Sequence, residues 1–291
     1  MRPSQFDSQI KEVARTKILA LEEALSADVI LYFGPISPVI ETRFRDFIED
    51  LKEDSPGRNR LAIVLSTPGG SAETVEKMVE IVRHHYSEVY FVIPDEAMSA
   101  GTIFALSGDG IYMDYSSSLG PIDPQVHNGK SWVPALGYLD QVQKMMEKSA
   151  AGTITDAELV MLQNLDLAML SRYEQAKNLS ITLLKKWLVE YKFKDWSKHR
   201  TNQAKLDHSV TTEEKQTRAE EIANRLSDNK IWHSHGRKIG VRTLSHVLRL
   251  QIEDYTDNTD LRDRIREYFE FITEYINRHD IPIFLHSRRY F

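Results

Sequence analysis

The fold of this 291-residue chain is decided by two stretches, Leu61-Ala62-Ile63-Val64-Leu65-Ser66-Thr67-Pro68-Gly69-Gly70-Ser71 and Met98-Ser99-Ala100-Gly101-Thr102. Each follows or contains an apolar run typical of a buried strand, and each leads into a helical pattern. The glycines stand where a backbone approaches a ligand closely, and Ser99 stands at the mouth of a helix. We therefore predict two strand-to-helix turns, an oxyanion hole at the first and a nucleophile at the second.

Strand and helix patterns alternate along the chain up to residue 137. The expected strands are Asp28–Phe33, Leu61–Leu65, Val89–Ile93 and Ile111–Met113, with helical segments between them. Their apolar runs do not alternate with polar residues, which indicates strands buried on both faces. The sequence thus predicts an α/β fold with a mostly parallel sheet.

The pattern after residue 137 is almost wholly helical. We expect an N-terminal helical segment at 1–26, an α/β core with the active-site turns at 27–137, and a helical C-terminal region at 138–291. The last residues, 284–291, combine basic and aromatic side chains, and we expect them to form a frayed tail.

Composition narrows the class of protein. The chain has 37 basic and 43 acidic residues and a formal charge of −6, which gives no general field for nucleic acid or anionic lipid. It has no cysteine, which excludes disulfides, thiolate zinc sites and a cysteine nucleophile. No apolar run approaches the roughly 20 residues of a membrane span. We expect a cytoplasmic protein.

The two turns favour acyl transfer through a tetrahedral intermediate. Such chemistry needs backbone N–H donors aimed at the developing oxyanion. The amides of Gly69 and Gly70 are unencumbered by side chains, and the amide of Ala100 supplies a further donor. Two plainer interpretations stay open, because Pro-Gly-Gly is a common turn and Ser99 could simply cap its helix.

Four motifs, taken in this order, resemble the Clp protease/crotonase superfamily. They are Ser66-Thr67-Pro68-Gly69-Gly70, Ala97-Met98-Ser99-Ala100-Gly101-Thr102, Leu119-Gly120-Pro121-Ile122-Asp123-Pro124-Gln125 and, more loosely, Trp232-His233-Ser234-His235-Gly236-Arg237-Lys238-Ile239. Within the superfamily the chain most resembles the serine dehydrogenase proteinases, relatives of the Clp proteolytic subunit and of signal peptide peptidase A. The resemblance covers the chain from about Asp28 to about Gly240.

The resemblance implies a fold of repeated β-β-α units and a serine endopeptidase that needs neither cofactor nor metal. Its substrate is then a peptide or protein, its nucleophile is Ser99, and its assembly is a homo-oligomer. The family order of serine, aspartate and histidine points to Asp123 and His235 as acid and base. His233 is the neighbour from which that base must be distinguished.

Other assignments of the base stay open. The Clp proteolytic subunit places its histidine soon after the serine, where this chain has His127. A serine–lysine dyad like that of signal peptide peptidases would use Lys130. The Asp123 carboxylate could also serve only local backbone bonds.

Two rival functions stay open as well. A crotonase-type acyl-CoA enzyme uses a similar oxyanion hole without a nucleophile, although Ser71-Ala72-Glu73-Thr74 lacks the crotonase alanine-glycine-alanine-aspartate pattern. A catalytically silent oligomeric scaffold could keep the fold. For a peptidase, we expect a side chain at Gly70 to lower turnover with little effect on stability.

Overall fold

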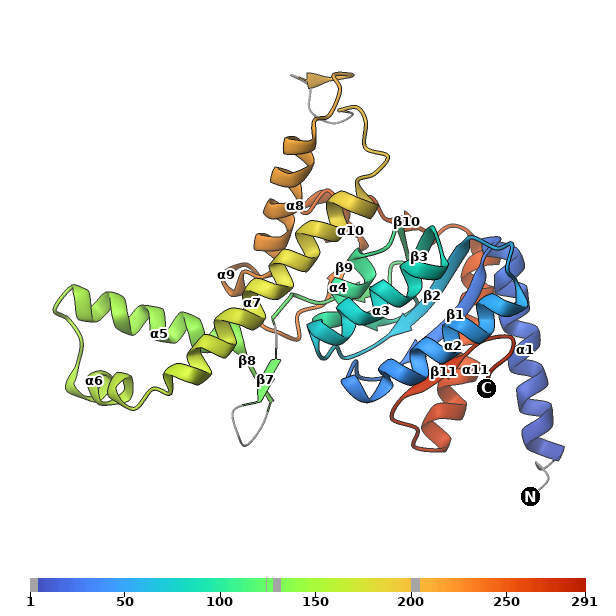
Figure 1. Ribbon diagram of the computed structural model, residues 1–291, viewed down its shortest axis with the longest axis horizontal. Helices are drawn as coiled ribbons and strands as arrows, with labels where there is room; N and C mark the ends of the chain where they lie inside the picture. The colour runs from blue at the N-terminus through green and yellow to red at the C-terminus, as the bar shows by residue number, and fades with distance from the viewer. Residues whose placement is uncertain (1–4, 124, 128–131, 200–204) are drawn as a thin grey trace.

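The computed structural model describes residues 5–123, 125–127, 132–199 and 205–291 (Figure 1). Its longer helices are α1 (Gln5–Leu25), α2 (Glu41–Asp54), α3 (Ala72–His85), α4 (Ala100–Leu106), α5 (Ala135–Ala150), α6 (Asp156–Gln163), α7 (Leu167–Trp187), α8 (Thr212–Leu226) and α11 (Thr259–Arg278). Short helices are α9 (Asn229–Trp232) and α10 (Val241–His246), with a 3-10 turn at Pro38–Ile40 and a π turn at Leu188–Lys192.

The strands form two main sheets. The larger has the order β10-β5-β3-β2-β1-β11. Its members are β1 (Asp28–Phe33), β2 (Arg60–Ser66), β3 (Glu88–Ile93), β5 (Gly110–Met113), β10 (Glu253–Asp254) and β11 (Phe284–His286). All neighbours pair in parallel except β11, which lies antiparallel to β1 at one edge. The predicted α/β class with a mostly parallel sheet is confirmed.

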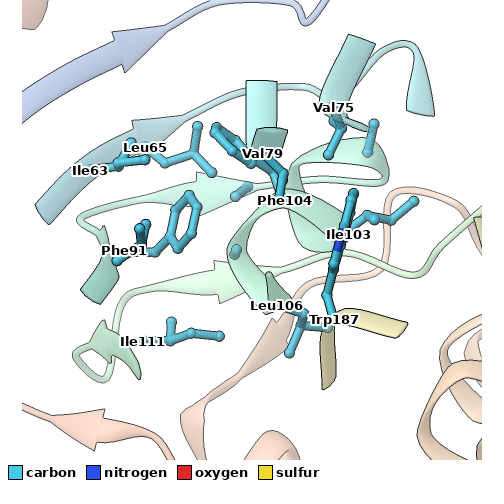
Figure 2. Close-up of a cluster of buried hydrophobic side chains, with 14 of the residues drawn as sticks. Ile63, Leu65, Val75, Val79, Phe91, Ile103, Phe104, Leu106, Ile111 and Trp187 are labelled. Carbon is cyan, nitrogen blue, oxygen red and sulfur yellow. The ribbon is translucent and has the colours of Figure 1, made fainter. Parts of the chain in front are cut away.

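Helices cover both faces of the large sheet. Alternate residues of β2 point to opposite faces, so Ile63 and Leu65 pack beneath α3 and α4, whereas Val64 packs beneath α1 and α11. Figure 2 shows the first of these cores, in which Phe91 meets Phe104 edge to face at 4.8 Å between ring centroids. Both faces of the sheet are buried and apolar, as the unbroken apolar strand runs indicate.

A smaller sheet lies beyond the ends of the large one, and the Ser99 turn follows one of its strands. It contains β4 (Glu96–Ala97), β6 (Ser118–Leu119) and β9 (Ile239–Gly240), in the order β4-β6-β9. Single parallel bridges, Thr67 to Ala97 and Ile36 to Gly70, extend it. The four strands β1, β2, β3 and β5 thus each continue into a short second strand or bridge, and after β1, β2 and β3 a helix follows. This is the expected β-β-α repeat.

The first part of the helical C-terminal region projects from the sheets, and we call it the arm (Figure 1). In Figure 1, α5, α6 and the first part of α7 extend away from the sheets, and the small hairpin of β7 (Gln125–His127) and β8 (Trp132–Pro134) lies at their base. The helical path is interrupted between α6 and α7, where the Asp166 side chain caps a new helix. Among the described residues, no helix is apolar over a length that would cross a bilayer.

The end of the chain returns to the large sheet, so the expectation of a frayed tail is wrong. Strand β11 pairs with β1, and His286 and Ser287 are buried. Arg288 is held by Glu22 and Asp28, with oxygens at 2.6 and 2.8 Å from its Nη1. Arg288 thus finds two buried carboxylates that composition alone does not reveal. The division into 1–26, 27–137 and 138–291 stays a prediction.

Candidate active site

Ser99 lies on a strained turn between β4 and α4. Its φ of 51° and ψ of −113° fall in a region that costs a non-glycine residue about 1–3 kcal/mol. The turn is held on both sides: Met98 donates its N–H to the Thr67 carbonyl at 2.9 Å, and its own carbonyl accepts the Gly101 N–H at 2.8 Å. Such strain, imposed by the surrounding backbone bonds, is typical of a functional residue.

The Ser99 hydroxyl does not cap helix α4, although Ser99 occupies the N-cap position. It donates instead to the backbone carbonyl of Asp123 at 3.1 Å. Ser99 is 2% exposed. The plain N-cap interpretation of this serine is therefore wrong, and its hydroxyl faces the Asp123 loop.

The glycine turn packs directly against the Ser99 turn. Gly69 has φ 103°, and a Cβ there would lie 2.7 Å from the Met98 carbonyl oxygen and 2.9 Å from Ser99 Cβ. The Gly69 N–H is already used, since it donates to Thr67 Oγ1 at 3.0 Å. In the part of the chain that the structure describes, the N–H groups of Gly70 and Ala100 have no acceptor. These two amides are the donors left for an oxyanion.

Gly70 is needed for the fold itself, contrary to our expectation that a side chain there would spare stability. Its φ is 150°, and a Cβ would lie 1.9 Å from the carbonyl oxygen of Ile36. Ile36 is fixed, because its N–H donates to Gly69 and its carbonyl accepts from Ser71. A side chain at Gly70 therefore breaks this bridge between the segment after β1 and the glycine turn.

Asp123 connects the Ser99 turn with the late histidine motif. Its carboxylate is buried, at 1% exposure of the side chain, and Oδ1 accepts the N–H of Leu136 at 3.0 Å. Its Oδ2 lies 3.7 Å from Nδ1 of His235. Neither of these last two atoms has a hydrogen-bond partner within the described ranges. The carboxylate therefore does more than close its own turn: it bonds the first turn of α5 and faces His235.

The structure distinguishes His235 from its neighbours. His235 has a side-chain exposure of 24%, whereas His233 is exposed and ends α9 in a left-handed conformation. Lys238 of the same motif pairs with Glu96 at 2.9 Å, and this carboxylate raises the pKa of its ammonium, which makes it an unsuitable base. Of the alternative bases, Lys130 lies outside the described residues, and for His127 only the backbone in β7 is described.

The described residues contain no group of three or more histidine, cysteine, aspartate or glutamate side chains placed to hold a metal ion.

The Leu136 amide is the contact of Asp123 that the sequence could not suggest. It is a backbone group 13 residues further on, and no side-chain type signals it.

A comparison with known protein families identifies the family of this chain. The chain belongs to the family of ClpP-like, SDH-type serine proteinases, whose family model matches residues 46–230, more than half of the sequence. The resemblance to serine dehydrogenase proteinases is thereby confirmed, and the Clp-like fold with it.

Similar sequences occur in the archaeon Methanocaldococcus jannaschii. The uncharacterized protein MJ0137 is 30% identical over 161 residues, which are 55% of this chain and 52% of that protein. The uncharacterized protein MJ1495 is 29% identical over 151 residues, 50% of this chain and 49% of that one. The chain thus spans about half the length of the curated relatives it matches.

A solved structure of the 1510-N membrane-bound stomatin-specific protease, in a serine-to-alanine mutant, is also similar. The match has 14% identity and a TM-score of 0.45, and it covers 81% of this chain and 82% of that one. A similarity at this level says nothing about the activity of this chain.

Proposed function

We propose that this chain is a serine endopeptidase that hydrolyses peptide bonds through an acyl-enzyme on Ser99. The observation that carries the proposal is the Ser99 turn: a strained, non-capping serine whose hydroxyl points at the loop of a buried carboxylate. Membership of a serine proteinase family supports it.

In this proposal His235 is the general base and Asp123 orients it. The imidazole presents Nδ1 to the carboxylate, so Nε2 is the nitrogen left for the serine. Ser99 Oγ attacks the peptide carbonyl carbon and its proton passes to His235. The C–N bond then breaks as the imidazolium returns that proton to the leaving amine. Water, deprotonated by the same histidine, then attacks the ester carbonyl carbon; the bond from this carbon to Ser99 Oγ breaks, and the imidazolium returns the proton to the serine.

The oxyanion of each tetrahedral intermediate would be held by the N–H groups of Gly70 and Ala100. Two facts support this assignment: both amides lack an acceptor among the described residues, and the neighbouring Gly69 backbone packs against the Ser99 turn. Loss of one such donor typically costs about 10²–10³ in rate. Gly69 contributes by close packing, because its own N–H is bonded to Thr67.

The site as described is a resting arrangement. The Ser99 hydroxyl is bonded to the Asp123 carbonyl, and Asp123 Oδ2 stands 3.7 Å from His235 Nδ1, roughly 0.8 Å beyond a good hydrogen bond. Catalytic hydrogen bonds are often long in enzymes without substrate and tighten when it binds. We infer that the carboxylate and imidazole close together as the substrate displaces the Asp123 carbonyl from Ser99.

The partners expected from the sequence are part of the proposal: a peptide or protein substrate, no nucleic acid, and a second copy of this chain. The arm supports an oligomer. Helix α6 has no buried residue, and three of its apolar side chains are exposed: Leu159 by 41%, Val160 by 55% and Met161 by 62%. Exposed apolar side chains that gather in this way favour contact with another chain. Wild type should therefore sediment as a larger species than Met161→Asp. The cytoplasmic location stays a prediction.

Hydrolysis of a fluorogenic casein tests the function. Ser99→Ala should abolish turnover and keep the fold and oligomeric state of wild type, because it removes one hydroxyl. Equal activity in this variant would refute the peptidase mechanism. An inactive wild type that hydrates an enoyl-CoA would favour the crotonase alternative, and a wild type inactive in both assays would favour the scaffold.

The base is tested with matched alanine variants of His235, His233, His127 and Lys130. With His235 as base, only His235→Ala loses activity by orders of magnitude. With a lysine base, Lys130→Ala is the inactive variant and His235→Ala keeps most of its activity.

A further inference from the structure

A buried hydroxyl in the first turn of α4 joins the two backbone segments that carry the site. Thr102 is fully buried, and its Oγ1 lies 2.9 Å from the carbonyl oxygen of Ala97 and 2.8 Å from that of Gly120. The same oxygen accepts the N–H of Gly120 at 3.0 Å. The single hydroxyl proton thus faces two carbonyls and one lone pair accepts an N–H, and all three bonded groups belong to β4 or to the residue after β6.

These bonds are not the ones that a helical threonine makes by default. Within a helix a threonine hydroxyl returns to the carbonyl three or four residues back. Here the acceptor is Ala97, which precedes the Ser99 turn and lies outside α4. The hydroxyl thus spans the turn instead of completing the helix.

Ala97 and Gly120, the residues that Thr102 bonds, lie immediately before the two segments that carry the site. Strands β4 and β6 pair up to Ala97 and Leu119, and beyond that pair the chains lead to Ser99 and to Asp123. At the far end the segments meet again, where the Ser99 hydroxyl donates to the Asp123 carbonyl at 3.1 Å. Thr102 closes the base of this loop.

The loop has little room to adjust at its base. A Cβ at Gly120 would lie 2.7 Å from Met98 Cε and 3.1 Å from Met98 Cα, so these backbones are in direct contact. A change in the spacing of β4 and β6 is therefore passed on to the distance between Ser99 and the Asp123 carboxylate, and hence to His235. A misplacement of about 1 Å in a catalytic group can cost about 10²-fold in rate.

We propose that Thr102 is a positioning residue for this reaction: its hydroxyl sets the register between the nucleophile turn and the Asp123 loop. The proposal rests on the proposed peptidase function and deepens it. The hydrogen bonds of the Thr102 hydroxyl go to backbone groups and not to the Ser99 hydroxyl. It acts through the backbone of Ala97 and Gly120, and its loss should lower the reactivity of Ser99 without changing substrate affinity.

The test compares Thr102→Val, which keeps the branched shape and removes the hydroxyl, with Thr102→Ser, which keeps the hydroxyl. The matched control is Ser107→Ala at the other end of α4, where a buried hydroxyl donates to the Phe104 carbonyl at 2.7 Å, away from the turn. For each variant the measurements are kcat, KM, the rate constant of labelling by a fluorophosphonate, and the melting temperature.

We expect Thr102→Val to lower kcat and the labelling rate about 10- to 100-fold at nearly unchanged KM. Thr102→Ser should stay within a few-fold of wild type. Ser107→Ala should lower the melting temperature about as much as Thr102→Val and label like wild type. Thr102→Ala, which cannot overpack the site, should repeat the valine result.

Several outcomes would overturn the positioning role. These are wild-type labelling by Thr102→Val, an equal loss in Thr102→Ser, or valine and alanine variants that do not fold, which would make the hydroxyl a folding determinant. A wild type that never reacts would refute the peptidase function and the positioning role together. A reactive wild type with an equally reactive Thr102→Val would refute the positioning role alone.

Discussion

Replacing Asp123 by asparagine separates the electrostatic role of this carboxylate from its structural one. Oδ1 holds the Leu136 N–H at 3.0 Å, and an amide oxygen can take over that bond. Oδ2 faces His235 at 3.7 Å, and there the substitution removes the negative charge that would stabilise an imidazolium. Asp123→Asn should therefore fold normally and react slowly.

The expected size of both effects follows from the contacts of the two carboxylate oxygens and from general values for such contacts. In a serine–histidine–aspartate triad the change to asparagine lowers kcat about 10⁴-fold, or roughly 5 kcal/mol in the activation barrier. Asp123→Asn should lower the free energy of unfolding by less than about 1 kcal/mol, since the Leu136 bond survives. Asp123→Ala leaves that buried N–H without its acceptor and should cost about 1–3 kcal/mol in addition to the activity.

The assay pairs casein hydrolysis with urea unfolding for wild type, Asp123→Asn and Asp123→Ala. The two variants should be similarly inactive and differ in stability. Activity of Asp123→Asn within tenfold of wild type, in a folded enzyme, would refute the assignment of Asp123 as the group that orients the base. The carboxylate would then be only an acceptor for the first turn of α5.

Further predictions concern the scaffold. Gly70→Ala should lower the melting temperature strongly, because its Cβ would lie 1.9 Å from the Ile36 carbonyl, whereas Gly152→Ala, with nothing within 4 Å, should be much milder; equal melting points would contradict this. Arg288→Ala leaves the buried carboxylates of Glu22 and Asp28 undercompensated and should cost about 3–5 kcal/mol in urea unfolding; a loss under 1 kcal/mol would be the contrary result. Burial lowers the pKa of His286 to about 3, below the unfolded value near 6.5, so the unfolded chain binds the proton first and stability falls as pH drops from 6.5 towards 3. His286→Gln lacks this titration, and its urea midpoint should fall less steeply between pH 7 and 4; equal slopes would contradict the assignment.

The central strands could be predicted because burial on both faces leaves a clear trace in sequence. The expected strand over Asp28–Phe33 coincides with β1, and the one over Leu61–Leu65 lies inside β2. The edge strands β10 and β11 have two and three residues, too few for any periodicity. Their places depend on long-range contacts, such as those of Arg288, that a local pattern does not contain.

Some residues of the candidate site can be predicted from the local sequence, and others cannot. The turn at Ser99 follows from local glycines and a strand end, whereas the proximity of Asp123 and His235 came only from a family resemblance. The Thr102 hydroxyl carried no signal, because a threonine in a first helical turn is ordinary. The sequence indicates that a glycine is needed at position 70, and it suggests a catalytic reason. The structure shows that the reason is steric, because a side chain there would meet the Ile36 carbonyl.

The most direct test of the account is to react the folded protein with a fluorophosphonate and locate the adduct by tandem mass spectrometry. The serine oxygen displaces fluoride from phosphorus, so only an activated serine is modified. We predict one adduct, on Ser99, that is absent from Ser99→Ala and from protein unfolded in urea. No adduct on the folded wild type, or an adduct on another serine with Ser99 unmodified, would contradict it.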